Sequence, residues 1–386
     1  MTARLDVRLV AQALRQEAAL KDAPRLARTI RVLEGWLRRG LAVEAARPPG
    51  PIRELHLELT HRCNMRCRMC HHWAMPLADR SAAGRELSLD EIRGLVKGSR
   101  LLRGVETVVL TGGEPWLRED LTRIAAFLAG HFPQASLGIL SNLSDAGTIR
   151  GRLRELRRLG VGRLWLGSSL DGLEQAHDDL RGQRGAFKAL LATLDMLRRD
   201  FPAVTVSLNF TITPRNHAAL WSAYEFALGR GLGFSAQLVV EHEGLKAPET
   251  FHWRAAQLAE VERQIDRILL DLHARRGTEG PSWLWPRLLY WSFLKKYARR
   301  PRRFFAACPA GSRTAMLSPE GGLFFCPVNK NRLVGEVRAE AFDDLWRSAR
   351  AESERGFMAS GRCHCWLNCV AQPLLESALR ECSSSR

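Results

Sequence analysis

The amino-acid sequence predicts an α/β fold in which a partial (β/α)6 barrel carries a small, Cys-rich C-terminal domain. Apolar strand-like segments alternate six times with amphipathic helical segments before residue 250, which is typical of βαβ units around a parallel sheet. Six units are too few for a closed eight-fold barrel. After about residue 305 the segments become short and contain Gly and Cys, so a second domain is expected there.

The hydrophobic pattern places each element in order. The expected strands are 52–59, 105–110, 135–140, 163–168, 205–212 and 234–240. The expected helices are 88–102, 119–130, 148–159, 185–199, 216–229 and 253–275, which show apolar residues at helical spacing. The resulting domains are a helical N-terminal extension at 1–50, the barrel at 51–250, a helical, aromatic and basic connector at 251–304, and the Cys-rich domain at 305–386.

Composition narrows the class of protein. The 386 residues contain no apolar run long enough for a membrane span, and the N-terminus lacks the apolar core of a signal peptide. A cytoplasmic protein without a membrane span is therefore expected. The net charge is +17, but the basic residues are spread along the whole chain, so nucleic acid is not expected as a partner.

One local basic cluster needs its own interpretation. Residues 281–305 read PSWLWPRLLYWSFLKKYARRPRRFF. Such a segment is compatible with a nucleic-acid stacking surface or an interfacial helix at an anionic membrane. We favour a connecting helix whose aromatic side chains pack on the barrel and whose Arg side chains face solvent.

Three cysteines follow the first expected strand. Cys63, Cys67 and Cys70 have the spacing C-x3-C-x2-C, and the end of a barrel strand is where active sites lie. Three thiolates can hold three irons of a 4Fe–4S cluster and leave the fourth iron open. The alternative is a structural zinc site completed by His61, His71 or His72, although zinc loops usually contain C-x2-C pairs.

The next strand ends in a second motif. It reads Thr111-Gly112-Gly113-Glu114-Pro115. Together with the Cys motif and Met69 before its last Cys, this sequence resembles the radical S-adenosylmethionine (SAM) superfamily and its GGE motif. Glycines allow close approach of backbone to a ligand, and loop carbonyls with Glu114 can accept hydrogen bonds from the SAM ammonium group.

Further residues match the superfamily at later strand ends. Ser169-Leu170-Asp171-Gly172 resembles the SLDG stretch of the subfamily that matures peptides and proteins. Arg181 resembles an Arg that faces the SAM carboxylate, a charge-assisted contact. The cofactor-binding residues that the resemblance implies are Gly112, Gly113, Glu114, Pro115, Ser141, Asn142, Ser169, Asp171 and Arg181.

The resemblance also implies a reaction. Cys63, Cys67 and Cys70 would be the catalytic cluster ligands. One electron from an electron donor such as flavodoxin or ferredoxin would cleave SAM to methionine and a 5′-deoxyadenosyl radical, which takes a hydrogen atom from the substrate. The SLDG-like stretch favours a peptide or protein substrate that is oxidised or cross-linked. The alternative is a small molecule such as a sugar or an alcohol.

A second group of cysteines lies near the C-terminus. Gly321 precedes Cys326 in a G-x4-C pattern, and the whole group resembles the SPASM and twitch extensions of radical SAM enzymes. The resemblance implies one auxiliary 4Fe–4S cluster, held by Cys308, Cys326 and two of Cys363, Cys365 and Cys369, of which Cys365 and Cys369 are favoured. A four-Cys zinc site is the alternative, and Cys382 is expected to be a free thiol.

A third hypothesis belongs to another class of protein. The Cys groups could hold zinc in a nucleic-acid-binding module that uses the +17 charge. Strongly salt-dependent binding to RNA or DNA would favour this interpretation.

Overall fold

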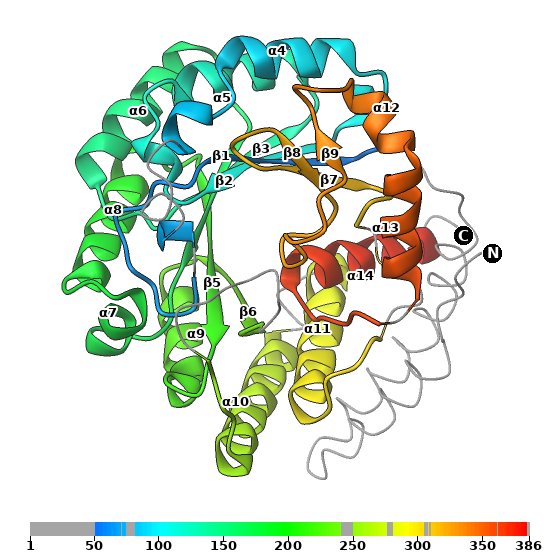
Figure 1. Cartoon of the computed structure of the whole chain (residues 1–386). Coiled ribbons are helices and arrows are strands. Elements are labelled where there is room, and N and C mark those ends of the chain that lie inside the picture. Colours follow the sequence, from blue (N-terminus) through cyan, green and yellow to red (C-terminus); the bar gives the residue numbers. More distant parts are fainter. Residues whose placement is uncertain are drawn as a thin grey trace.

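The computed structural model describes residues 51–70, 72–74, 82–240, 250–275, 281–304, 308, 310–360 and 362–383. The predicted N-terminal helical extension at 1–50 lies outside these residues. Within them, nine strands form one curved sheet in the order β6-β5-β4-β3-β2-β1-β7-β8-β9 (Figure 1). The strands are β1 (Glu54–Thr60), β2 (Thr107–Gly112), β3 (Ser136–Leu140), β4 (Leu164–Ser169), β5 (Thr205–Ile212), β6 (Gly233–Leu238), β7 (Thr314–Leu317), β8 (Gly322–Phe324) and β9 (Gly335–Glu336).

The first six strands pair in parallel and in chain order. Helices lie on the outside of the curved sheet (Figure 1), so the predicted partial barrel is confirmed. The α-helices are α4 (Leu89–Gly98), α5 (Leu121–His131), α6 (Ala146–Arg158), α7 (Gln175–Arg181), α8 (Ala186–Asp200), α9 (Leu220–Gly229), α10 (Ala255–Ala274), α11 (Pro281–Arg299), α12 (Phe342–Arg347), α13 (Ala349–Ala359) and α14 (Asn368–Ser383). Single 3-10 turns lie at His72–Ala74, Ala82–Arg85, Leu101–Gly104, Pro115–Leu117 and His217–Ala219.

Strand β1 illustrates how the sequence builds the barrel. Its apolar residues Leu55, Leu57 and Leu59 are buried, and they alternate with Glu54, His56, Glu58 and Thr60. Side chains alternate between the two faces of a strand, so the apolar set and the polar set project from opposite faces of the sheet. Each fully buried leucine stabilises the fold by about 1.5–3 kcal/mol relative to exposure. The polar set is the one that later joins the functional site.

Local capping fixes where the surrounding helices begin. Ser88 and Glu91 form a capping box at the start of α4, in which the Ser88 hydroxyl accepts from the Glu91 N–H and the Glu91 carboxylate accepts from the Ser88 N–H. The Asp145 carboxylate accepts a 2.9 Å hydrogen bond from the Thr148 N–H at the start of α6. Such caps typically contribute about 1 kcal/mol each.

The Cys-rich region is joined to the barrel through the same sheet. Strand β7 pairs in parallel with β1, and the antiparallel hairpin of β8 and β9 continues from it. Helices α11 and α14 pack on each other and on β6, on the side where the barrel is open (Figure 1). The barrel and the Cys-rich region therefore share one sheet.

The aromatic segment packs as the sequence analysis favoured. Tyr290, Trp291 and Phe293 of α11 are buried; Trp291 stacks on Phe234, and the Tyr290 hydroxyl donates a 2.8 Å hydrogen bond to the Ala236 carbonyl. Side chains used in this way cannot form a stacking surface for bases. In the described part of the chain no helix is both long enough and apolar enough to cross a membrane.

Candidate active site

The three cysteines of the C-x3-C-x2-C motif lie on one loop directly after β1. Cys67 is buried with Met65 and Ala186, and Cys63 and Cys70 pack against this group. The loop is held in place from outside, because the Arg68 N–H donates a 3.0 Å hydrogen bond to the Leu180 carbonyl at the end of α7. The Trp73 indole N–H donates to the Cys67 carbonyl at 3.2 Å.

The thiols of this loop are suited to bind metal. Burial, together with the adjacent Cys67 and Cys63, raises the pKa of the Cys70 thiol to about 11. Burial also raises the pKa of Cys63. Clustered thiolates without a cation repel one another, whereas a bound metal ion stabilises them. This donor set of three neighbouring thiols therefore fits the predicted iron–sulfur cluster.

The GGE loop at the end of β2 lies against the start of the Cys loop. The Gly113 N–H donates to the Thr60 carbonyl at 2.7 Å, and the Glu114 N–H donates to the Arg62 carbonyl at 2.8 Å. A Cβ on Gly112, whose φ is +129°, would lie 2.3 Å from the Thr60 oxygen. A Cβ on Gly113 would lie 2.2 Å from the Arg62 oxygen. Both positions therefore require glycine.

Glu114 connects two of the predicted strand ends. Its carboxylate accepts hydrogen bonds from the Asn142 N–H at 2.8 Å and from the Trp116 N–H at 3.2 Å. Burial raises its pKa to about 7, although these bonds and one from Ser141 oppose the shift. The Asn142 amide in turn donates to Asn64 of the Cys loop at 2.8 Å.

The end of β4 reaches the Cys loop through α7. Asp171 is fully buried and accepts a 2.7 Å hydrogen bond from the Thr211 N–H. It pairs with Arg181, whose Nη1 lies 3.7 Å from the Cys67 sulfur. The Arg181 Nε is buried without a hydrogen-bond partner among the described residues, which leaves a donor for a bound ligand.

The other predicted residues lie on the same strand ends. Pro115 is buried and begins the 3-10 turn Pro115–Leu117. Ser169 is the last residue of β4 and pairs with Asn209 of β5. Asn209 itself accepts hydrogen bonds from Ser235 and Asn368, so it belongs to a separate polar group where α14 meets the sheet.

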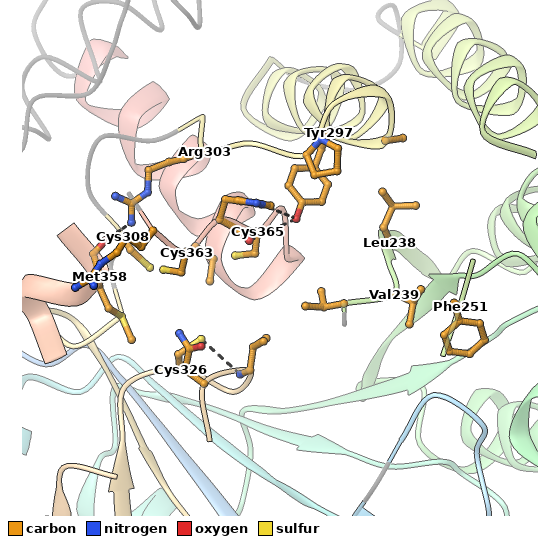
Figure 2. A pocket seen from close by; sticks show the side chains of 18 of the residues that line it. Leu238, Val239, Phe251, Tyr297, Arg303, Cys308, Cys326, Met358, Cys363 and Cys365 are labelled. Carbon is orange, nitrogen blue, oxygen red and sulfur yellow. Dashed lines mark hydrogen bonds between the residues drawn. The ribbon is translucent and has the colours of Figure 1, made fainter. Parts of the chain in front are cut away.

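The second group of cysteines borders a cavity of about 540 Å³. Figure 2 shows Cys308, Cys363 and Cys365 near one another, with Cys326 below them in the view. The opposite wall is apolar and contains Leu238, Val239 and Phe251 (Figure 2).

These four thiols share an environment with Cys369. Burial raises the pKa of Cys308 and of Cys365 to about 12, and neighbouring thiols add to the shift. Cys369 lies near Cys365 and Cys326, but it is exposed and does not line the cavity. The donor set fits a second metal cluster, for which the sequence supplies one thiol more than a cubane needs.

A buried ion-pair network links the two groups of cysteines. Lys330, which follows Cys326 on the same loop, pairs with Glu58 of β1. Its ammonium also lies 3.3 Å from Nε2 of His72, two residues after Cys70. The Nδ1 atoms of His61 and His72 lie 3.4 Å apart. The Nε2 atom of His61 lies 3.0 Å from the Glu320 carboxylate.

This network could not be predicted from the sequence, because nothing in the local pattern connects Glu58 with Lys330. Ligand atoms of Glu58, His61 and His72 lie within 4.8 Å of one another, but the Lys330 ammonium already supplies the positive charge there. Burial acts to raise the pKa of Glu58, and Lys330 and His72 together lower it below its ordinary value. Of the three His residues considered for a zinc site, His61 and His72 thus belong to an ion-pair network, and His71 lies outside the described residues.

Lys330→Met is expected to destabilise the protein, because it leaves the buried Glu58 carboxylate without its cation. Removing one partner of a buried pair typically costs about 3–5 kcal/mol. The measurement is anaerobic thermal unfolding followed by circular dichroism. The double variant Glu58→Gln/Lys330→Met should recover most of the loss, and a single variant as stable as the parent would contradict the assignment.

Comparison with known proteins agrees with this geometry. The family model described as the Radical SAM superfamily matches residues 57–227. Fe-coproporphyrin III synthase of Methanosarcina barkeri is 24% identical over 319 residues, covering 77% of this chain and 74% of the relative. A probable GTP 3′,8-cyclase of Metallosphaera sedula is 27% identical over 312 residues, covering 80% of this chain and 92% of the relative.

Solved structures share the fold. SuiB of Streptococcus suis superposes with a TM-score of 0.56 at 15% identity, over 86% of this chain and 72% of SuiB. The anSMEcpe structure with bound AdoMet and Cp18Cys peptide gives a TM-score of 0.60 at 12% identity, over 86% of this chain and 97% of that one. The family match places the chain among enzymes, against the hypothesis of a zinc-dependent nucleic-acid-binding module. Residues 57–227 belong to the radical SAM superfamily: the chain is an enzyme of the family that uses a 4Fe–4S cluster and SAM, and a Cys-rich region follows this domain.

Proposed function

We propose that this enzyme abstracts a hydrogen atom from a peptide or protein side chain and that the product is oxidised or cross-linked. The observation that carries the proposal is the presence of two separate clusters of cysteines. One lies at the carboxyl ends of the barrel strands, and the other faces a cavity with an apolar wall. When bound, a 4Fe–4S cluster reduced by a donor such as flavodoxin or ferredoxin cleaves SAM to methionine and a 5′-deoxyadenosyl radical.

The residues of this chain have distinct parts in the proposal. Cys63, Cys67 and Cys70 hold the cluster. The Glu114 carboxylate and the backbone of the GGE loop bind the SAM ammonium, as the hydrogen-bonded junction with Asn142 supports. Arg181 keeps one unpartnered donor, Nε, for the SAM carboxylate. Ser141 and Ser169, with Gly112, Gly113, Pro115 and Asp171, complete the cofactor site.

The cavity beside the second cluster of cysteines supports the proposal that the substrate is oxidised. Loss of a hydrogen atom leaves a substrate radical, which becomes a closed-shell product after it gives up one electron and one proton. Cys308, Cys326, Cys363 and Cys365 line the cavity together, so we assign them the auxiliary cluster that accepts this electron, with Cys369 as the alternative fourth ligand. The apolar wall opposite suits an apolar part of the substrate.

Two substrate classes have support. SuiB is known with its bound precursor peptide SuiA and anSMEcpe with a bound peptide, and both share this fold. The Fe-coproporphyrin III synthase and GTP 3′,8-cyclase relatives favour a small molecule instead. We prefer a peptide because the SLDG-like stretch supports it independently of the fold.

The proposal is tested by asking which compound accelerates SAM cleavage. The reconstituted enzyme is reduced with dithionite and supplied with SAM and, in separate arms, a randomised peptide library, GTP or iron-coproporphyrin III. We expect peptides alone to raise 5′-deoxyadenosine formation above the background and to lose 2 Da. A Cys326→Ser variant should still form 5′-deoxyadenosine without the 2 Da product. Acceleration by GTP or the porphyrin alone would replace the peptide proposal with the small-molecule one.

The pKa of Glu114 predicts how SAM binding depends on pH. Because burial raises this pKa to about 7, the carboxyl group is neutral below pH 7 and binds an ammonium ion poorly. SAM affinity should therefore rise about tenfold from pH 6 to pH 8, as measured by equilibrium dialysis. Glu114→Gln should bind more weakly at pH 8 and show no such slope. A variant that keeps the parent's slope would exclude Glu114 as its source.

A further inference from the structure

Arg181 has a contact that a role in SAM binding does not explain. It is the last residue of α7, its side chain is 12% exposed, and its Nη1 lies 3.7 Å from the Cys67 sulfur. The Nη2 atom of the guanidinium pairs with Asp171, which is fully buried. The cation thus contacts both a cluster-ligand sulfur and a carboxylate.

The backbone holds this arrangement from both sides. Gly182 ends α7 at a φ of +63°, and a Cβ there would lie 2.2 Å from the Arg66 carbonyl oxygen of the Cys loop. The Arg68 N–H donates to the Leu180 carbonyl at 3.0 Å. On the far side, Asp171 is held by the Thr211 N–H. The guanidinium is therefore fixed relative to the Cys67 sulfur and has little freedom to move away.

A fixed cation beside a ligand sulfur changes the energy of electron transfer. Reduction adds negative charge to an iron–sulfur cluster, and hydrogen bonds and positive charge at its sulfurs favour the reduced form. The effect is strong in a buried site, where water screens the charge poorly. Asp171 acts in the opposite direction, but its carboxylate contacts Nη2 of the guanidinium, whereas Nη1 contacts the Cys67 sulfur itself.

We infer that Arg181 raises the reduction potential of the cluster held by Cys63, Cys67 and Cys70, and that Asp171 limits this rise. Arg181 is in this respect a positioning and tuning residue, and the effect exists before SAM binds. The inference rests on the proposed function, because it requires the cluster to form on this loop.

The test is a redox titration of the reconstituted protein followed by EPR in the absence of SAM. The main variant is Arg181→Gln/Asp171→Asn, which removes both charges and leaves no buried charge unpaired. At a fixed potential, we expect its ratio of reduced to oxidised cluster to fall about tenfold, equivalent to about 59 mV for one electron. Asp171→Asn alone should shift the potential in the opposite direction. Arg181→Lys, which keeps the charge, should restore most of the parent value.

The auxiliary cluster is the internal control, because its potential should be the same in all these proteins. A Cys63→Ala/Cys67→Ala/Cys70→Ala variant identifies its signal. Unchanged potentials in every variant, or shifts of the same sign in Asp171→Asn and the double variant, would overturn the inference while leaving the proposed function intact. A parent protein without a cluster on this loop would overturn both.

Discussion

A protein in which Cys63, Cys67 and Cys70 are all replaced by alanine is expected to form no 5′-deoxyadenosine and to contain about half the iron of the parent. The reason is that the cysteines form two separate clusters, each of which is expected to hold its own iron–sulfur cluster. The first, on the loop after β1, packs with Met65 of that loop and with Ala186 of α8, whereas the second borders a cavity that the first does not line. Removing one group should therefore leave the other cluster in place. Iron and sulfide analysis after anaerobic reconstitution, together with chromatography of the SAM products, measures both effects.

The matched control is Cys326→Ser, which should lose the other half of the iron and still cleave SAM. The two variants together distinguish a loss of one cluster from a general failure to assemble metal. If the triple variant kept all of its iron, or if the parent held zinc in place of iron, the assignment of the first thiol group would be wrong.

Gly113→Ala is expected to abolish SAM binding. The new Cβ would lie 2.2 Å from the Arg62 carbonyl oxygen and 2.7 Å from the His61 oxygen. Neither oxygen is at the end of a flexible side chain, so the GGE loop and the Cys loop must move apart. That movement breaks the two backbone hydrogen bonds that join them and displaces Glu114. We expect SAM affinity to fall by at least about 100-fold, since a displaced ligand group typically costs several kcal/mol.

Gly130→Ala is the matched control, because Gly130 is exposed on α5 and a Cβ there meets no atom within 4 Å. Alanine in a helix interior is favoured over glycine by about 0.5–1 kcal/mol, so this variant should bind SAM as the parent does and be slightly more stable. Equilibrium dialysis with SAM compares the two. Normal binding by Gly113→Ala would show that the loops do not need their close approach.

Much of the fold could be read from local pattern. The predicted strand 205–212 is observed as Thr205–Ile212, and the predicted 185–199 helix as Ala186–Asp200. Both have a periodicity that a short window of sequence contains, and Pro202 separates them. The short helix α7 (Gln175–Arg181) was not predicted, because seven residues between two glycine-containing turns give too little periodicity.

The sequence by itself also predicted the chemistry of the first site. The spacing of Cys63, Cys67 and Cys70 and the glycines of the GGE loop are local, and their positions after successive strands follow from the parallel sheet. The carboxyl ends of such strands meet at one edge. The hydrogen bond between the Asn142 N–H and the Glu114 carboxylate therefore follows from the order of the strands in the sheet.

Only the tertiary structure decided which distant charges meet. Lys330 pairs with Glu58 because β7 pairs with β1, and Arg181 faces Cys67 because α7 ends against the Cys loop. Neither contact leaves a periodicity in the sequence, since an isolated Lys or Arg reads as a solvated surface residue. Long-range pairing alone buries such a residue, and a buried charge must then find a partner across the fold.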